Sequence, residues 1–289
     1  MFWKDVGLGF NTYGKALTLI FSKGLWWFFL FPLAFNILLF WGGIEGIGFL
    51  GDWFNAKLMG WLHLDQAEFW GSGVLKTILE YLVKGIFNFI FFALFAYLGG
   101  FIVLIIMSPV LAYVSEKTEK ILTGNDYPFS SAQLMRDMVR GILLALRNMF
   151  IELGWSVLFF LIIVVPVIGW LIRLLQIDDV LLFLIASYFY GFSFLDYSIE
   201  RQKLNVKKSV LLVRKRKGLA LANGTIFSVT LFIPYIGVGL AGFTAIVSTV
   251  AAAIAMTQVV EEEKGNTRIF NAVPLAENKD ENLAGKITD

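Results

Sequence analysis

The sequence contains no cysteine and only one histidine, His63, among its 289 residues. Without thiols the chain cannot form disulfides, thiolate nucleophiles or cysteine–metal sites. A single histidine cannot supply several ligands to a zinc ion. It also leaves only His63 as the possible base of a Ser-His-Asp triad. We therefore predict no catalytic residue, no metal site and no cofactor. An enzyme is the least favoured class.

Charge is also scarce in this sequence. Only 16% of the residues are Asp, Glu, Lys or Arg, while 58% are hydrophobic. Soluble domains carry roughly 25% charged residues, so a soluble chain of this composition could not cover its surface. The composition predicts an all-α integral membrane protein.

Three segments in the first half predict helices at or in the membrane. Residues 5–22 have apolar side chains at spacings of three and four, which is typical of a helix lying in the membrane interface. A helix packed on another protein surface is the alternative. A first long span runs from Leu25 to just before Glu45, and a second covers 85–107. Each has about the 20 apolar residues that cross a bilayer, and a loop at 43–77 joins them.

Two amphipathic helices follow the second span. Beyond Pro109 the helix is expected to continue into water and to end at the turn signal 123–126. A further helix is predicted over 131–148, with apolar residues on one face and basic residues on the other. Its basic residues are Arg136, Arg140 and Arg147. Such a face favours contact with anionic membrane lipids.

The second half contains two apolar blocks, 149–195 and 218–260, each broken by a Pro-x-Ile-Gly sequence at Pro166 or Pro234. Proline removes a backbone donor and glycine relaxes the backbone, so each break predicts the turn of a helical hairpin. The matching breaks raise the possibility of an internal repeat, with a chance match as the alternative.

The arms of these hairpins are short in the sequence reading. Each of two arms, 180–195 and 218–233, would have 16 residues, or about 24 Å of helix. A bilayer core is about 30 Å thick. The two hairpins are therefore predicted to enter the membrane only partway or to thin it locally.

The distribution of Lys and Arg predicts the orientation of the chain. Segment 109–148 carries five basic residues and segment 197–218 carries eight, while loop 43–77 carries two. By the positive-inside rule the first two segments and both termini are cytoplasmic. Residues 1–260 are expected to form one membrane domain, and 261–289 a polar, disordered cytoplasmic tail. The basic segment 197–218 lies between two apolar blocks, so we expect it to contact lipid headgroups rather than nucleic acid.

A few polar side chains lie in apolar surroundings. Asn36, Asn88 and Glu152 are candidates for lining a polar pathway, because ionisable and polar groups in a bilayer are costly and mark functional routes. For the asparagines, a hydrogen bond between helices is the alternative. For Glu152 the alternative is a carboxylate that extends to water at the end of its helix.

Several short motifs, in order, resemble one family. They are Ser22-Lys23-Gly24-Leu25, Phe31-Pro32-Leu33-Ala34-Phe35-Asn36, Ser108-Pro109 with Leu122-Thr123-Gly124, Phe194-Leu195-Asp196-Tyr197, the basic run to Lys217, and Pro234. Together they are similar to the CysZ-type sulfate permeases of the etoposide-induced-protein superfamily. The resemblance covers about residues 5–258. It implies two long spanning helices, two partly inserted hairpins and assembly into a homo-oligomer.

The same resemblance implies an anion site at the start of the first span. The family has Gly-Leu/Ile-Arg there, followed by a basic residue. Gly24 and Leu25 match, and Lys23 precedes them, but Trp26 and Trp27 occupy the basic positions. Helix N-terminal N–H groups can hold an anion, with Lys23 supplying charge. Plain interfacial anchoring by the tryptophans is the alternative.

The leading hypothesis is a permease-like protein of the cytoplasmic (inner) membrane that moves a small inorganic anion, sulfate or another oxyanion. The alternative is a non-transporting membrane scaffold of the same fold, whose basic cytoplasmic face binds lipid or a protein partner.

Overall fold

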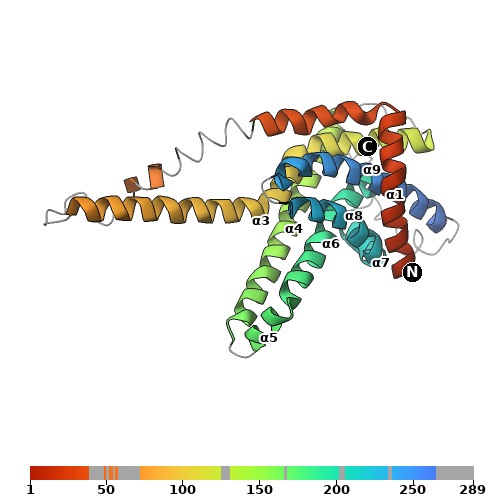
Figure 1. The fold of residues 1–289 in the computed structure, drawn as a ribbon. Coiled ribbons are helices and arrows are strands. Elements are labelled where there is room, and N and C mark those ends of the chain that lie inside the picture. Colours follow the sequence, from red (N-terminus) through yellow and green to blue (C-terminus); the bar gives the residue numbers. More distant parts are fainter. Residues whose placement is uncertain are drawn as a thin grey trace, which may run out of the picture.

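The computed structural model describes residues 1–38, 49, 52–54, 56–57, 72–124, 131–165, 168–201, 206–233 and 236–264. All the elements identified in these ranges are helical (Figure 1). They are α1 (Phe2–Ser22), the 3-10 helix η1 (Leu25–Phe29), α3 (Ser72–Thr123), α4 (Ser131–Ile163), α5 (Ile168–Leu174), α6 (Ile177–Arg201), α7 (Val206–Lys215), α8 (Lys217–Leu231) and α9 (Gly237–Lys264).

Within the described residues, four helices are long and apolar enough to cross a membrane. They are Leu98–Thr123, Met138–Ile163, Ile177–Ile199 and Gly237–Glu262. The shortest has 23 residues, which is about 35 Å of helix against a bilayer core of about 30 Å. This finding confirms the predicted all-α integral membrane fold.

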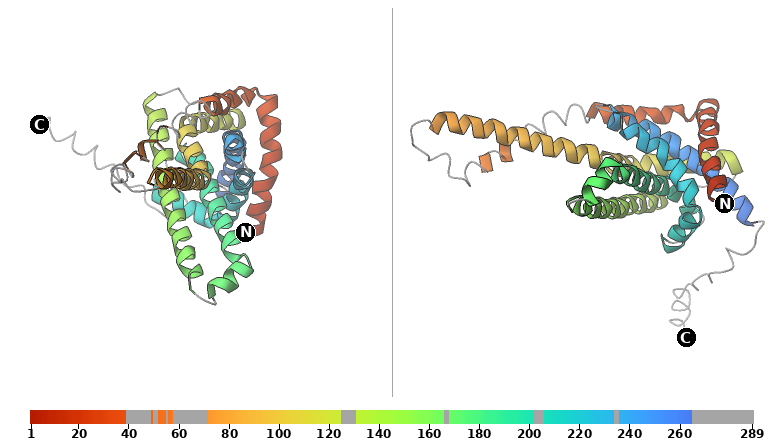
Figure 2. Two further views of the ribbon diagram at one scale, coloured as in Figure 1. Left: turned by 60° about the vertical axis from the view of Figure 1, so that its left-hand side comes forward. Right: turned by 60° about the horizontal axis from the view of Figure 1, so that its bottom comes forward.

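The core of the molecule is built around α8 and α9. Both views in Figure 2 place these helices within the body, beside α1 and α6. Their inward side chains are mostly small. On α8 the buried residues are Gly218, Leu219, Ala220, Ala222, Asn223, Gly224, Phe227 and Ser228. Small residues let helix backbones approach closely in a membrane protein.

The closest approach in the core joins α6 to α8. A Cβ added at Gly191 would lie 1.8 Å from the Ala220 carbonyl oxygen, and one at Gly224 would lie 1.7 Å from the Ser187 carbonyl oxygen. Neither space can hold a methyl group, because unbonded heavy atoms pack at about 3.5 Å. Glycine at both positions therefore permits this backbone contact.

Helix α1 has the amphipathic character predicted for 5–22, but it begins at Phe2. Its buried side carries Asp5, Gly9, Thr12, Tyr13, Ala16 and Ile20 and packs on α8 and α9. The predicted apolar stripe is divided, because Phe10, Leu17 and Phe21 are exposed together with Trp3. These exposed apolar residues agree with a helix that contacts protein on one side and lipid on the other.

Helices α4, α5 and α6 form a hairpin that projects from the body (Figure 1). Residues 131–148 and the following apolar arm form one continuous helix, α4. The prediction of a separate amphipathic helix before the hairpin was therefore wrong. The arm predicted over 180–195 was also too short, because α6 has 25 residues, about 37 Å of helix.

The second hairpin keeps one short arm. Helix α8 has 15 residues, about 22 Å, as the sequence predicted for this arm. Its partner α9 has 28 residues. Pro166 and Pro234 lie outside the described residues, and partial insertion of the hairpins stays a prediction.

Helix α3 is a single helix of 52 residues that continues through Pro109, as predicted. It also begins well before the predicted span 85–107. Its N-terminal half extends out of the body, and its C-terminal half packs against α4 and α9 (Figure 1). The side chains of 87–97 lie outside the described residues, so the apolar stretch that the structure gives begins at Leu98.

The predicted tail starts too early. Helix α9 continues through Glu261 to Lys264, and Glu262 forms ion pairs with the body. The remaining tail, 265–289, lies outside the described residues, as does most of the predicted loop 43–77. The first predicted span is described only as Leu25–Leu38, which is bent by 101° from α1.

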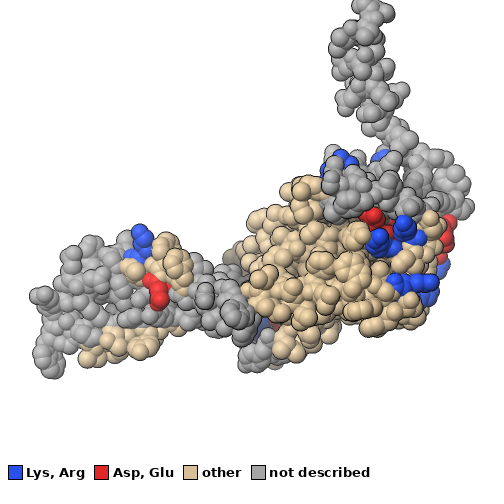
Figure 3. Space-filling model, turned by 90° about the horizontal axis from the view of Figure 1, so that it is seen from above, with Lys and Arg blue, Asp and Glu red and all other residues tan. Residues whose placement is uncertain are grey.

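Viewed from above, the described surface separates charge from apolar area. Figure 3 shows acidic and basic side chains gathered at one end of the body, beside a broad face of uncharged residues. The exposed apolar residues include Leu158, Phe160 and Leu161 of α4 and Val180 and Leu184 of α6. An exposed apolar surface of this kind suits contact with lipid.

Candidate anion-binding site

The predicted anion site lies at the sharp corner between α1 and η1. The backbone N–H of Lys23 donates to the Leu19 carbonyl and ends α1. Gly24 then has φ 72° and ψ 21°, a left-handed conformation that glycine adopts at little cost. Leu25, the first residue of η1, is buried. The sequence thus makes a turn in which exposed Lys23 and Gly24 precede buried Leu25.

Aromatic rings, rather than guanidinium groups, line the outer side of this corner. Trp26 and Trp27 are 54% and 39% exposed. Trp27 stacks on Phe28 with a centroid distance of 4.0 Å, and Phe28 meets the ring of Tyr113 edge-on at 5.7 Å. The Lys117 Nζ lies 5.2 Å from the centre of that tyrosine ring.

Lys23, which is exposed, shortly precedes Trp26 and Trp27 in the sequence. Backbone N–H groups at the start of η1 and a lysine charge can together attract an anion. They lack the planar fork with which arginine binds an oxyanion at two points. The geometry therefore supports a weaker site than the family motif implies.

The three predicted pathway residues lie on different elements. Asn36 donates from Nδ2 to the Gly239 carbonyl at 2.7 Å, so its amide joins the Leu25–Leu38 helix to α9. The side chain of Asn88, on α3, lies outside the described part of the chain. Glu152 is buried on α4. Among the described side chains, neither Asn36 nor Glu152 forms a hydrogen bond or ion pair with Lys23.

Glu152 differs from Asn36 in its hydrogen bonding. Its side chain is 5% exposed, and its Oε2 has no hydrogen-bond partner among the described residues. Buried polar atoms are almost always hydrogen-bonded, so an exception calls for a functional explanation. Its location inside the Met138–Ile163 stretch argues against a carboxylate that simply extends to water.

Sequence reasoning missed a buried ion-pair network that joins the two ends of the chain. Arg216, between α7 and α8, donates to Asp5 at 2.8 Å and to Glu262 at 3.2 Å, and Lys4 contacts Glu262 at 2.9 Å. Burial opposes the charge of Arg216, but the two carboxylates outweigh it and raise the pKa of Arg216. Only the folded chain brings α1, α8 and α9 together here.

A second network fixes the projecting hairpin to the basic segment. Arg140 of α4 donates from Nε and Nη2 to the two carboxylate oxygens of Asp196 on α6, at 2.9 Å each. Its Nη2 also donates to Ser209 Oγ of α7 at 2.7 Å. Arg140 was predicted to lie on a basic face that contacts anionic lipids, but in the structure the buried Asp196 carboxylate holds its guanidinium.

A third polar cluster lies inside the core. The Tyr13 hydroxyl contacts the Asn223 carbonyl and, at 2.8 Å, Ser248 Oγ. Asn223 Nδ2 donates to the Ser248 carbonyl at 3.2 Å. Asn223 thus forms a hydrogen bond between α8 and α9. Tyr13 gave no signal in the sequence beyond its place on an apolar stripe.

Known proteins match this chain over most of its length. A profile of the family described as Sulfate transporter CysZ/Etoposide-induced protein 2.4 matches residues 12–261. Three relatives are each named Sulfate transporter CysZ. The protein of Pseudomonas syringae pv. tomato is 24% identical over 274 residues, covering 92% of this chain and 95% of the relative.

The other two relatives show the same level of identity. That of Pseudomonas fluorescens Pf0-1 is 23% identical over 234 residues, covering 78% of this chain and 84% of the relative. That of Pseudomonas aeruginosa LESB58 is 23% identical over 231 residues, covering 77% and 85%. With the family profile spanning 12–261, this chain belongs to the Sulfate transporter CysZ/Etoposide-induced protein 2.4 family.

Proposed function

We propose that this chain is a permease of the inner membrane that moves a small oxyanion, with sulfate as the first candidate. The observation that carries the proposal is the family match over 12–261, which includes all four apolar helices nearly to their ends. The relatives' common name, Sulfate transporter CysZ, supports sulfate as the substrate. Transport is favoured over catalysis for the same reason.

The anion would first bind at Lys23, Gly24 and Leu25. Gly24 makes the turn before η1, and both Gly24 and Lys23 are exposed. Within the membrane, Glu152 is the proposed pathway residue, because its carboxylate is buried and incompletely bonded. Asn36 is a weaker candidate for a pathway residue, because its amide already donates a hydrogen bond to Gly239 of α9. Asn88 remains a proposal from the sequence alone.

Both termini are proposed to face the cytoplasm. The Lys4–Glu262 ion pair supports a common side, because it joins the beginning of α1 to the end of α9. The basic residues of α7, among them Arg214 and Lys215, favour the cytoplasmic side under the positive-inside rule. Assembly into a homo-oligomer and contact with lipids are proposed from the exposed apolar helix faces.

The test is sulfate uptake by purified protein in liposomes. Wild-type protein should take up radiolabelled sulfate above protein-free liposomes, and Lys23→Ala should slow the uptake severalfold. Lys15→Ala is the matched control, because Lys15 is also exposed but lies on α1. Equal uptake by wild type and Lys23→Ala would refute the site, and uptake no greater than in protein-free liposomes would refute the function. The second result would favour the scaffold alternative.

A further inference from the structure

A cavity lies between α4, α6 and α7. These helices do not include the Lys23–Leu25 corner. Its volume is about 200 Å³, and it is lined by Arg147, Ile151, Trp155, Tyr188, Phe189, Phe192, Val210 and Arg214. A water molecule occupies roughly 30 Å³, so the space holds a sulfate-sized group together with several waters.

Two guanidinium charges line this cavity without a carboxylate to balance them. Arg147 donates from Nη1 to the uncharged Asn148 Oδ1 at 3.3 Å and lies 6.0 Å from the centre of the Phe192 ring. Arg214 is exposed, and neither arginine forms an ion pair with any described residue. The neighbouring Arg140 differs, because Asp196 neutralises it.

These features together describe a receptor for an anion. Two positive charges beside one cavity repel each other, and a bound anion would relieve that repulsion. Guanidinium groups bind tetrahedral oxyanions through charge-assisted, often paired hydrogen bonds. The Tyr188 phenol also lines the cavity. Its hydroxyl is an additional donor.

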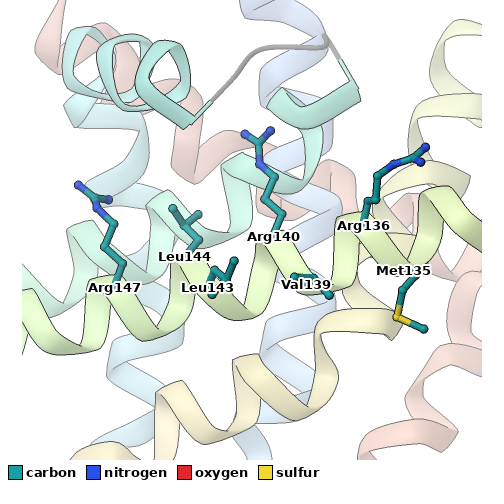
Figure 4. A pocket seen from close by; sticks show the side chains of 7 residues that line it. All are labelled: Met135, Arg136, Val139, Arg140, Leu143, Leu144 and Arg147. Carbon is teal, nitrogen blue, oxygen red and sulfur yellow. The ribbon is translucent and has the colours of Figure 1, made fainter.

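A groove of about 540 Å³ adjoins the cavity at Arg147. Figure 4 shows Arg136, Arg140 and Arg147 projecting to the same side of α4 along this groove. Of these three arginines, only Arg147 also lines the cavity itself.

We propose that the cavity between α4, α6 and α7 binds a tetrahedral oxyanion through Arg147 and Arg214. The proposal rests on the proposed function only for the choice of sulfate as the free ligand. A phospholipid headgroup offers the same phosphate chemistry, so the experiment distinguishes the free ion from the lipid.

The absence of cysteine allows a reporter to be placed in the cavity itself. The Val210→Cys variant would be labelled with N-ethylmaleimide in nanodiscs of neutral phosphatidylcholine. Sulfate should slow labelling at least threefold compared with chloride at the same ionic strength. A Met135→Cys variant, at an exposed α4 position outside the cavity, should show no protection. For the lipid, nanodiscs containing phosphatidylglycerol and no sulfate should slow the same labelling if the headgroup is the ligand.

The arginines are tested in the Val210→Cys background. Arg147→Gln with Arg214→Gln should abolish the protection, whereas Arg136→Gln, the charge-matched control outside the cavity, should preserve it. If the double variant does not fold, Arg214→Gln alone decides, because its side chain is exposed. Protection by neither sulfate nor phosphatidylglycerol, or protection that survives loss of these arginines, overturns the proposal. Protection without sulfate uptake would uphold the site and refute the permease, and the reverse result would do the opposite.

Discussion

The contact between α6 and α8 makes a sharp prediction for Gly224→Ala. The added methyl carbon would lie 1.7 Å from the Ser187 carbonyl oxygen and within 2.5 Å of the Gly191 backbone nitrogen. Both obstacles are backbone atoms, so no side-chain rotation can relieve the clash and the helices must separate. Overpacking of this kind costs about 1–3 kcal/mol, and alanine returns about 1 kcal/mol through helix propensity. Subtracting the two leaves a net loss of up to about 2 kcal/mol, with the upper end expected because the contacts are with backbone atoms.

The assay is thermal unfolding of the purified protein in detergent, with Gly14→Ala as the matched control. Gly14 is also a helical glycine, but a Cβ there meets nothing within 4 Å. Gly14→Ala should therefore hold or raise the midpoint, while Gly224→Ala should lower it by several degrees, at about 2–4 °C per kcal/mol. If both variants raised the midpoint equally, α6 and α8 would not be in backbone contact and the proposed core would be wrong.

Three further predictions test the polar networks and the anion site. Arg216→Gln leaves buried Asp5 without its partner and should cost about 3–5 kcal/mol, seen as a lower unfolding midpoint. Lys4→Gln, which breaks an exposed pair, should cost less than about 1 kcal/mol, and equal losses would contradict the difference in burial. Arg140→Gln should lower the free energy of unfolding less in an Asp196→Asn background than in wild type, because the two side chains interact. Additive effects in this double-mutant cycle would refute the pairing. Trp26→Arg should tighten sulfate binding about tenfold by calorimetry, from one charge-assisted hydrogen bond, and unchanged affinity would count against an anion site at this corner.

Much of the membrane architecture could be predicted from the sequence, because the bilayer imposes a length and a composition on each helix. The apolar blocks before and after Pro166 and Pro234 correspond to helices in the structure. The continuation of α3 through Pro109 was also predicted from its amphipathic pattern. Helix boundaries were less certain, because apolar and amphipathic stretches can join in one helix, as they do in α4.

The partners of individual side chains could not be predicted. Asp5 and Arg216 are separated by 211 positions, and nothing local in the sequence connects them. The central place of α8 was equally hidden, because beyond Lys217 the helix has no charged side chain to indicate which face packs. The ring contacts of Phe28 were also hidden, because it stacks with Trp27 and meets Tyr113, which lies on α3 far along the chain.

The central claim is that this chain carries an oxyanion across the membrane. The most direct measurement is the initial rate of radiolabelled sulfate entry into proteoliposomes of the wild-type protein, over a range of sulfate concentrations. A rate that exceeds protein-free liposomes and saturates with concentration is predicted, because transport through a binding site has a limited capacity. Entry no faster than the protein-free leak, at every concentration, would contradict the account.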